Sequence, residues 1–174
     1  MSFKWNKEWA EQILNFSKNV PEDADDLIEL IELPDGVNDK RVIQTMARCT
    51  RYEMYGIEQT LLNEISRFDY KLYFESIFEI IDEFFDEETY HEDAIFLLRQ
   101  GTHEAFTNLE ISNITKIAKE KLDKNQMKIL AKAIEYHNLE EYKDAVKRGS
   151  EFYIRIDQIY NDLYNFFMKE IENI

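Results

Sequence analysis

The stretch that decides the fold runs from Asp69 to Asp93 and reads DYKLYFESIFEIIDEFFDEETYHED. Ten of its residues are Asp or Glu, and Lys71 is its one basic residue. The apolar residues recur at steps of three and four, which places them on one face of a helix. That face would hold Tyr70, Tyr73, Ile77, Ile80, Ile81 and Phe84. Because the acids form a second stripe, the pattern predicts a helix with one buried face and one strongly negative face.

The composition of the whole chain favours the same kind of structure. The 174 residues are 44% hydrophobic and 14% aromatic, too apolar for a disordered acidic tail despite a net charge of −15. Four glycines and two prolines supply few tight turns, and so favour long helices. We therefore predict an all-α fold: one compact helical domain over residues 1–174 with about seven to nine helices.

Local signals divide the chain into these helices. We expect helices over residues 6–19, from 21 to the turn at 34–36, from 38 or 39 to about 67, and from 69 onward. Shorter helices would start near residues 89, 112, 123 and 139, and a last one at 150. The expected N-caps are Asp39, Asp69, Thr89, Ser112, Asp123 and Ser150. Thr89 and Glu92 have the spacing of a capping box. Gly56 would lie inside the long helix, either packed closely against a neighbour or at a kink.

Cysteine content and hydropathy favour a cytoplasmic protein. Cys49 is the single cysteine, so no intramolecular disulfide can form, and we expect it to be a small buried side chain. The first residues contain no apolar signal-like segment, and no uncharged run reaches the length of a membrane span. The sequence therefore predicts neither secretion nor membrane insertion.

The charge is concentrated in blocks. Residues 1–38 carry a net −6 and residues 69–98 a net −9, whereas residues 39–68 carry +1 and a lysine-rich stretch covers 116–132. Binding of nucleic acid normally needs a net basic face, which Lys40, Arg41, Arg48, Arg51 or the lysine-rich stretch would have to supply. We expect Arg41, Arg48 and Arg51 to pair with the acidic blocks of the same molecule instead. A field of this sign repels nucleic acid and attracts basic proteins. We thus expect a basic protein partner and no direct contact with nucleic acid.

Two short patterns could carry chemistry. Glu88 and His91 have the Glu-x-x-His spacing of carboxylate-bridged di-iron sites, but neither His103 nor His137 has a Glu three residues before it. Arg99 followed by His103 resembles the Arg and His pair of the helical HEPN ribonucleases, and this resemblance would imply cleavage of RNA. No complete catalytic or metal-ligating set is present, so we predict no catalytic residues, no metal and no cofactor.

These observations favour a non-enzymatic binding protein over an enzyme. The expected function is to dock, and thereby inhibit, a basic protein such as a nuclease toxin or a nucleic-acid enzyme, in the manner of immunity proteins, antitoxins and DNA mimics. The residues expected to contact the partner are Glu75, Glu79, Asp82, Glu83, Asp86 and Glu87. Two alternatives stay open: a helical enzyme of the HEPN-like or metal-dependent hydrolase type, and a helical adaptor or structural subunit.

Overall fold

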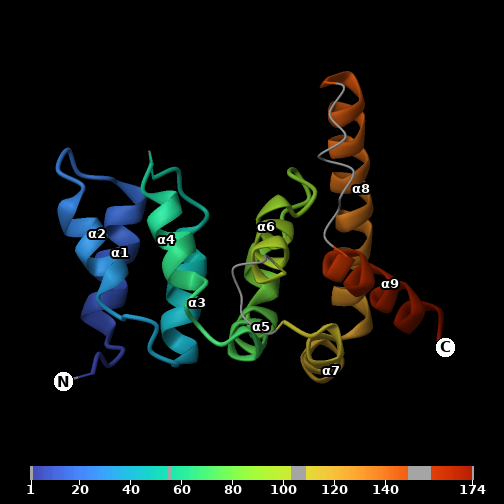
Figure 1. The fold of residues 1–174 in the computed structure, drawn as a ribbon, viewed down its shortest axis with the longest axis horizontal. Coiled ribbons are helices and arrows are strands. Elements are labelled where there is room, and N and C mark those ends of the chain that lie inside the picture. The colour runs from blue at the N-terminus through green and yellow to red at the C-terminus, as the bar shows by residue number, and fades with distance from the viewer. Residues whose placement is uncertain (1, 55, 103–108, 149–157, 174) are drawn as a thin grey trace.

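Two rows of helices make up the protein, as seen in a computed structural model that describes residues 2–54, 56–102, 109–148 and 158–173 (Figure 1). Within these residues the helices are α1 (Lys7–Lys18), α2 (Asp25–Glu32), α3 (Lys40–Cys49), α4 (Glu58–Ile65), α5 (Tyr70–Glu79), the 3-10 turn η1 (Ile81–Phe84), α6 (Glu92–Gly101), α7 (Ile111–Lys121), α8 (Lys124–Arg148) and α9 (Gln158–Glu172). No strand occurs in the described ranges. The all-α prediction is confirmed.

The rows follow from which helices pack together. In one row α1 contacts α3, α3 contacts α5, α5 contacts α7, and α7 contacts α9. In the other, α2 contacts α4 and α6 contacts α8. Figure 1 shows the result as helix pairs stacked along the long axis, with α1 and α2 at one end and α8 and α9 at the other. The main contacts therefore join helices that are one or two positions apart in the sequence.

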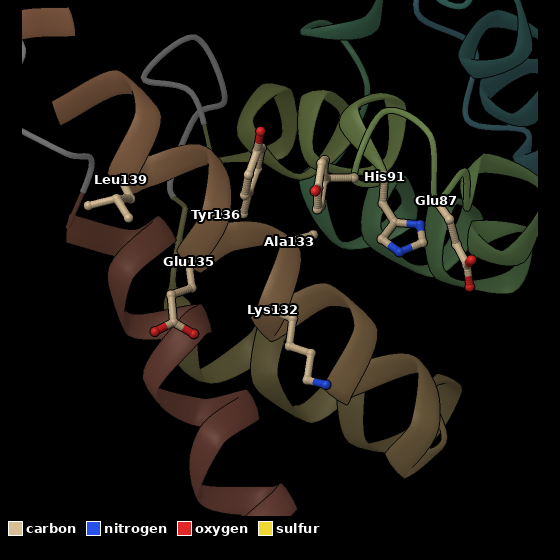
Figure 2. A pocket seen from close by; sticks show the side chains of 8 residues that line it. Glu87, His91, Lys132, Ala133, Glu135, Tyr136 and Leu139 are labelled. Atoms are coloured by element: carbon tan, nitrogen blue, oxygen red, sulfur yellow. The ribbon is translucent and has the colours of Figure 1, made fainter. Parts of the chain in front are cut away.

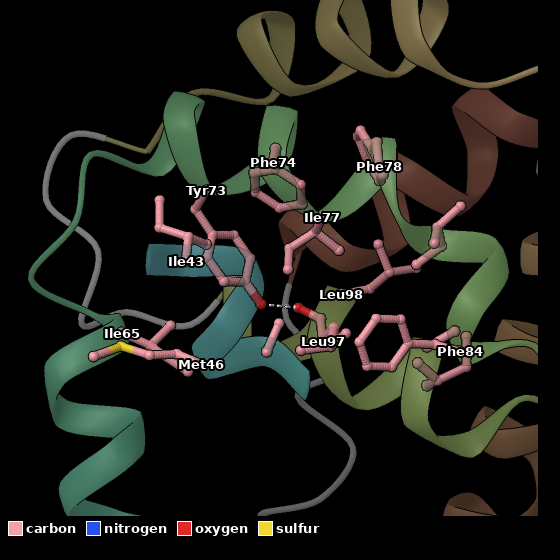
Figure 3. Close-up of a cluster of buried hydrophobic side chains, with 14 of the residues drawn as sticks. Ile43, Met46, Ile65, Tyr73, Phe74, Ile77, Phe78, Phe84, Leu97 and Leu98 are labelled. Atoms are coloured by element: carbon pink, nitrogen blue, oxygen red, sulfur yellow. Dashed lines mark hydrogen bonds between the residues drawn. The ribbon is translucent and has the colours of Figure 1, made fainter. Parts of the chain in front are cut away.

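The core is one continuous cluster of buried side chains that extends from Trp9 to Phe167. Its aromatic centre is α5, where Tyr73, Phe74 and Phe78 pack against one another (Figure 3). The hydroxyl of the buried Tyr73 donates a hydrogen bond of 2.7 Å to the carbonyl oxygen of Leu97, which ties α5 to α6. The apolar face predicted for this stretch is thus confirmed, although α5 buries residues on more than that face.

The helix expected from Asp69 onward is shorter than its periodic pattern indicates. Asp69 is the predicted cap, and its carboxylate accepts the backbone N–H groups of Lys71 and Leu72. The α-helix ends at Glu79, and the chain continues as the tighter η1. Isoleucines of this bend stay buried or half-buried, so the apolar spacing persists where the helix does not.

The single long helix expected over residues 38–67 is wrong. The structure divides it into α3 and α4, because the carboxylate of Glu58 accepts the backbone N–H groups of Met54 and Gly56 and stabilises a loop there. Gly56 has φ +94°, a conformation that L side chains rarely adopt, and an added Cβ would meet nothing within 4 Å. Gly56 therefore serves the loop and makes no close contact with a neighbouring helix.

The remaining boundary predictions divide between confirmed and corrected. Asp39 and Asp123 cap their helices, and the Gln126 side-chain oxygen accepts a hydrogen bond from the Asp123 N–H at 2.8 Å. Ser112 is no cap, since α7 begins at Ile111, and α2 begins four residues after Pro21. The helices expected on either side of Asn138 are one continuous α8. The cap expected at Ser150 lies outside the described residues.

The helices of the described ranges were compared with the length and hydropathy of membrane-spanning helices. None of them combines the length and the apolar character that a membrane crossing requires.

Candidate partner-binding surface

The carboxylates expected to face a partner lie on α5, on η1 and on the loop that follows. They are Glu75, Glu79, Asp82, Glu83, Asp86 and Glu87. The two on α5 pair with lysines. Lys40 Nζ lies 3.2 Å from Glu75 Oε2 and 2.9 Å from Glu79 Oε1, and Lys121 Nζ lies 2.7 Å from that same Glu79 oxygen. Hydrogen bonds from Lys121 and Lys40 lower the pKa of Glu79. Because Lys40 belongs to α3 and Lys121 to α7, the Glu79 carboxylate connects α3, α5 and α7.

The carboxylates of η1 are engaged in a similar way. Arg48 holds both oxygens of Glu83, and this bidentate contact lowers the pKa of Glu83. Arg51 donates to the Glu83 carbonyl oxygen. The Gln126 amide donates to Asp82 Oδ1 at 2.9 Å.

Four of the six carboxylates therefore contact cations or amides of neighbouring helices. The expected pairing with the acidic blocks is confirmed for Arg48, whereas Arg41 pairs with Asp39 and Arg51 contacts a backbone carbonyl oxygen. Lys40 and Arg48 lie eight residues apart and hence on one side of α3. This spacing is the feature of the sequence that could have indicated their pairing with the acidic stretch. Among the six, Asp86 and Glu87 have no side-chain contact with a cation or a side-chain amide of the described residues.

Asp86 and Glu87 belong to a loop, residues 85–91, that closes on itself. His91 N–H donates to the Asp86 carbonyl oxygen at 2.7 Å, and the Asp86 N–H donates to His91 Nδ1 at 3.0 Å. Tyr90 and His91 both have positive φ, 53° and 61°. The capping box predicted at Thr89 is wrong, because Thr89 lies in this loop and His91 precedes the first turn of α6 with no side-chain cap.

The loop and α8 enclose an open hollow of about 660 Å³, which we call the tyrosine groove (Figure 2). It is lined by Glu87, Tyr90, His91, Lys132, Ala133, Glu135, Tyr136 and Leu139. The rings of Tyr90 and Tyr136 stack with their centroids 3.9 Å apart and their planes 11° apart. Tyr90 is nevertheless 52% exposed and Leu139 52% exposed. The ring of His137 contacts the Tyr90 carbonyl oxygen at 3.0 Å, which fixes the loop on α8.

The loop that borders this groove and the first turn of α6 are rich in acidic residues. Asp86, Glu87, Glu88, Glu92 and Asp93 carry five carboxylates within eight residues, and within the described part of the chain none of them forms an ion pair. The pKa of Asp93 is raised, first by burial and further by the charges of Glu92 and Asp86, while Arg51 opposes the shift. The negative charge of this loop is thus only weakly compensated.

The Glu88 and His91 pair, whose spacing resembles that of a di-iron site, does not form a metal-binding arrangement in the described residues. Glu88 lies in the loop, and His91 uses Nδ1 as a hydrogen-bond acceptor for the Asp86 N–H. No group of three or more His, Cys, Asp or Glu side chains suited to a metal ion occurs among the residues described. Burial raises the pKa of the Cys49 thiol to about 11, which disfavours the nucleophilic thiolate.

Arg99, the arginine of the HEPN-like pair, is held against α8 and α9. Its guanidinium lies 5.4 Å from the centre of the Tyr160 ring and 3.5 Å from the Asn138 side-chain oxygen. His103 lies outside the described residues, so the pair itself has no geometry to report. Comparisons of this chain with protein-family models, with curated proteins and with solved structures found no match.

Proposed function

We propose that this protein is a non-enzymatic binding protein whose tyrosine groove and adjoining acidic loop dock a basic protein. The proposal is supported chiefly by one observation: the exposed, stacked pair Tyr90 and Tyr136 lies beside Glu87, a carboxylate that forms no ion pair with any described residue. Tyrosine rings and carboxylates together are suited to arginine, whose guanidinium stacks on aromatic faces and forms paired hydrogen bonds with carboxylates.

The ionic contacts explain why this part of the acidic stretch is the better candidate. Glu75, Glu79 and Glu83 already bind cations of α3 and α7, so a partner would have to displace those contacts. Asp86 and Glu87 form no ion pair within the part of the chain that the structure describes. Their repulsion from Glu88 and Glu92 in the free protein would be relieved by a partner's cations, which favours association and raises its rate.

The class of partner follows from the same chemistry. Enzymes and toxins that act on nucleic acids present basic surfaces to their substrates. A protein that covers such a surface with carboxylates blocks access of the substrate. We therefore propose inhibition of a basic nucleic-acid enzyme or nuclease toxin, of the immunity, antitoxin or DNA-mimic type, in a cytoplasmic setting.

A first experiment identifies the partner and then measures the groove's part in binding. The protein is used at low salt to capture partners from the source cell, and the affinity of the purified pair is measured by calorimetry at several salt concentrations. We expect the double variant Glu87→Lys/Glu88→Lys and the variant Tyr90→Asn each to weaken binding at least tenfold. Asparagine tolerates the positive φ at this position, so the loop should keep its shape.

The matched control is Glu53→Lys/Glu120→Lys, which changes the net charge equally at two exposed carboxylates that lie in no ion pair within the ranges described. It should leave affinity within about twofold at physiological salt, where exposed charges are screened beyond about 8 Å. Equal weakening by the control and by the groove variant would show that only total charge matters. That result would remove the tyrosine groove from the proposal.

A further inference from the structure

A second hollow lies between α1 and α2. Figure 1 shows this helix pair at the end of the molecule opposite to α8 and α9. Its volume is about 280 Å³, and it is lined by Gln12, Phe16, Asp26, Glu29, Leu30 and Leu33. We call it the leucine groove. Leu33 is 54% exposed, the largest exposed fraction among the big hydrophobic side chains described. The hollow is thus lined by a large apolar side chain that is exposed to solvent.

Asp26 and Glu29 line this hollow, and the sequence around them is strongly acidic. Residues 19–39 contain no lysine or arginine, and on α2 and its approach stand Glu22, Asp23, Asp25, Asp26, Glu29 and Glu32. None of these six carboxylates takes part in an ion pair within the described chain. The α5 carboxylates differ, since cations of α3 and α7 compensate them. The leucine groove therefore combines an apolar floor with uncompensated negative charge.

We propose that the leucine groove is a docking site for a basic amphipathic helix of a partner protein. One large apolar side chain of that helix would enter the hollow between Phe16, Leu30 and Leu33, and lysines or arginines on either side would meet the α2 carboxylates. A hollow of about 280 Å³ has room for one large apolar side chain of a docked helix.

This site is independent of the tyrosine groove. The two hollows share no lining residue. One is lined by α1 and α2, at one end of the long axis in Figure 1, and the other by α8 and the loop before α6, towards the other end. Because the tyrosine groove and the leucine groove are separate, the protein can bind two basic segments at the same time. Simultaneous engagement would raise the affinity for a partner that carries both segments, provided that their spacing matches.

The test uses three synthetic peptides of 18 residues. The first has leucines at helical spacing on one face and lysines elsewhere, the second replaces every lysine with glutamate, and the third replaces every leucine with serine. Each is titrated by calorimetry into the protein carrying Tyr90→Asn and Leu139→Ser, which removes the tyrosine groove as a competing site. Amide chemical-shift mapping by NMR locates the bound peptide.

We expect the leucine–lysine peptide to bind, to shift the amides of α1 and α2, and to lose at least tenfold in affinity when Leu33→Ser is added. The glutamate and serine peptides should each bind at least tenfold more weakly. Because Leu33 is exposed, the Leu33→Ser variant should fold, and an unchanged thermal midpoint verifies this.

Three outcomes overturn the proposal: no binding of the leucine–lysine peptide, equal affinity with Leu33→Ser, or equal affinity for the serine peptide. The last would show attraction by charge alone. Each leaves the tyrosine groove untested by design, so failure here is distinguishable from failure of the proposed function.

Discussion

Arg48 holds Glu83 by two parallel hydrogen bonds, Nε to Oε2 and Nη2 to Oε1, each 2.8 Å long. This fork joins α3 to η1 across 35 residues of sequence. Together with the bridges of Lys40 and Lys121 to Glu79, it turns part of the most acidic stretch into an ionic contact between helices. Carboxylates of the same sequence block thus serve two purposes, internal pairing on α5 and η1 and exposure on the loop beyond.

The paired carboxylates Glu79 and Glu83 should make the free energy of unfolding fall at acidic pH. Glu79 and Glu83 have folded-state pKa values below the ordinary 4.5, so their stabilising contribution is present above pH 4.5 and is lost as the pH falls below it. The variant Glu79→Gln/Glu83→Gln should lose about 1 kcal/mol at pH 7, a modest value because these side chains are partly exposed. Its loss relative to wild type should shrink towards pH 3. Urea unfolding followed by circular dichroism at both pH values measures this.

A control for this prediction is Glu53→Gln/Glu120→Gln, which neutralises two exposed carboxylates outside the ion pairs of the described chain. It should follow the wild-type curve within about 0.5 kcal/mol. A pH-independent difference between wild type and Glu79→Gln/Glu83→Gln would contradict the ionic origin of the effect.

Gly101 should be intolerant of any side chain. A Cβ at this position would stand 2.6 Å from both Phe74 Cζ and Tyr73 Cε1, so one of these buried rings must move. We expect Gly101→Ala to lower the free energy of unfolding by about 1–3 kcal/mol, the usual range for an overpacked core. Adding Phe74→Leu makes room, so the double variant should lose less than the sum of the single variants. Strict additivity would show that the close approach does not limit stability.

The buried carboxylate of Glu64 should contribute more to the free energy of unfolding than the exposed carboxylates do. It is 4% exposed, accepts the Gly36 N–H at 2.7 Å, and accepts Arg67 Nη1 at 3.0 Å. Glu64→Ala should cost about 2–3 kcal/mol, because hydrogen bonds to a charged group are lost and the donors stay in place. Glu64→Gln keeps one acceptor oxygen and should cost less. Equal losses in chemical denaturation would mean that the acceptor is not what matters.

Charge reversal should separate the two kinds of acidic residue. Glu79→Lys/Glu83→Lys places cations against Lys40, Lys121 and Arg48, so it should destabilise the fold measurably in thermal unfolding. Glu87→Lys/Glu88→Lys removes mutual repulsion in the loop and should leave the thermal midpoint unchanged or higher. A large loss of stability in the second variant would show that these loop carboxylates have a structural function as well.

Much of the fold could be predicted because apolar spacing reports burial. The steps of three and four between Ile43, Met46, Met54, Leu61 and Ile65 predict that these side chains face the core, and all five are buried. The error lay in treating the stripe as one helix, since spacing of three or four continues through the loop that Glu58 holds. Periodicity thus indicates which side chains face the core better than it indicates where the backbone remains helical.

The candidate site was less accessible to sequence reasoning. That Asp86 and Glu87 differ from Glu79 and Glu83 depends on which cations of α3 and α7 reach them, and this is set by packing. The tyrosine groove combines Tyr90 with Tyr136, residues from a loop and from a helix beyond it. The false capping box at Thr89 had the right residue types, but the positive φ of Tyr90 and His91 belongs to a closed loop instead.

The two-row order of the helices has a consequence for how the molecule opens. Because the main contacts join helices one or two positions apart, α1 and α2 rest mainly on α3 and α4 and on each other. Local unfolding of this end needs to break only those contacts, while the aromatic centre around Tyr73 stays packed. Amide hydrogen exchange should therefore be graded along the chain, faster in α2 than in α5. The terminal pair would then act as a separately closing unit, one that a bound helix protects from exchange without any change at the centre.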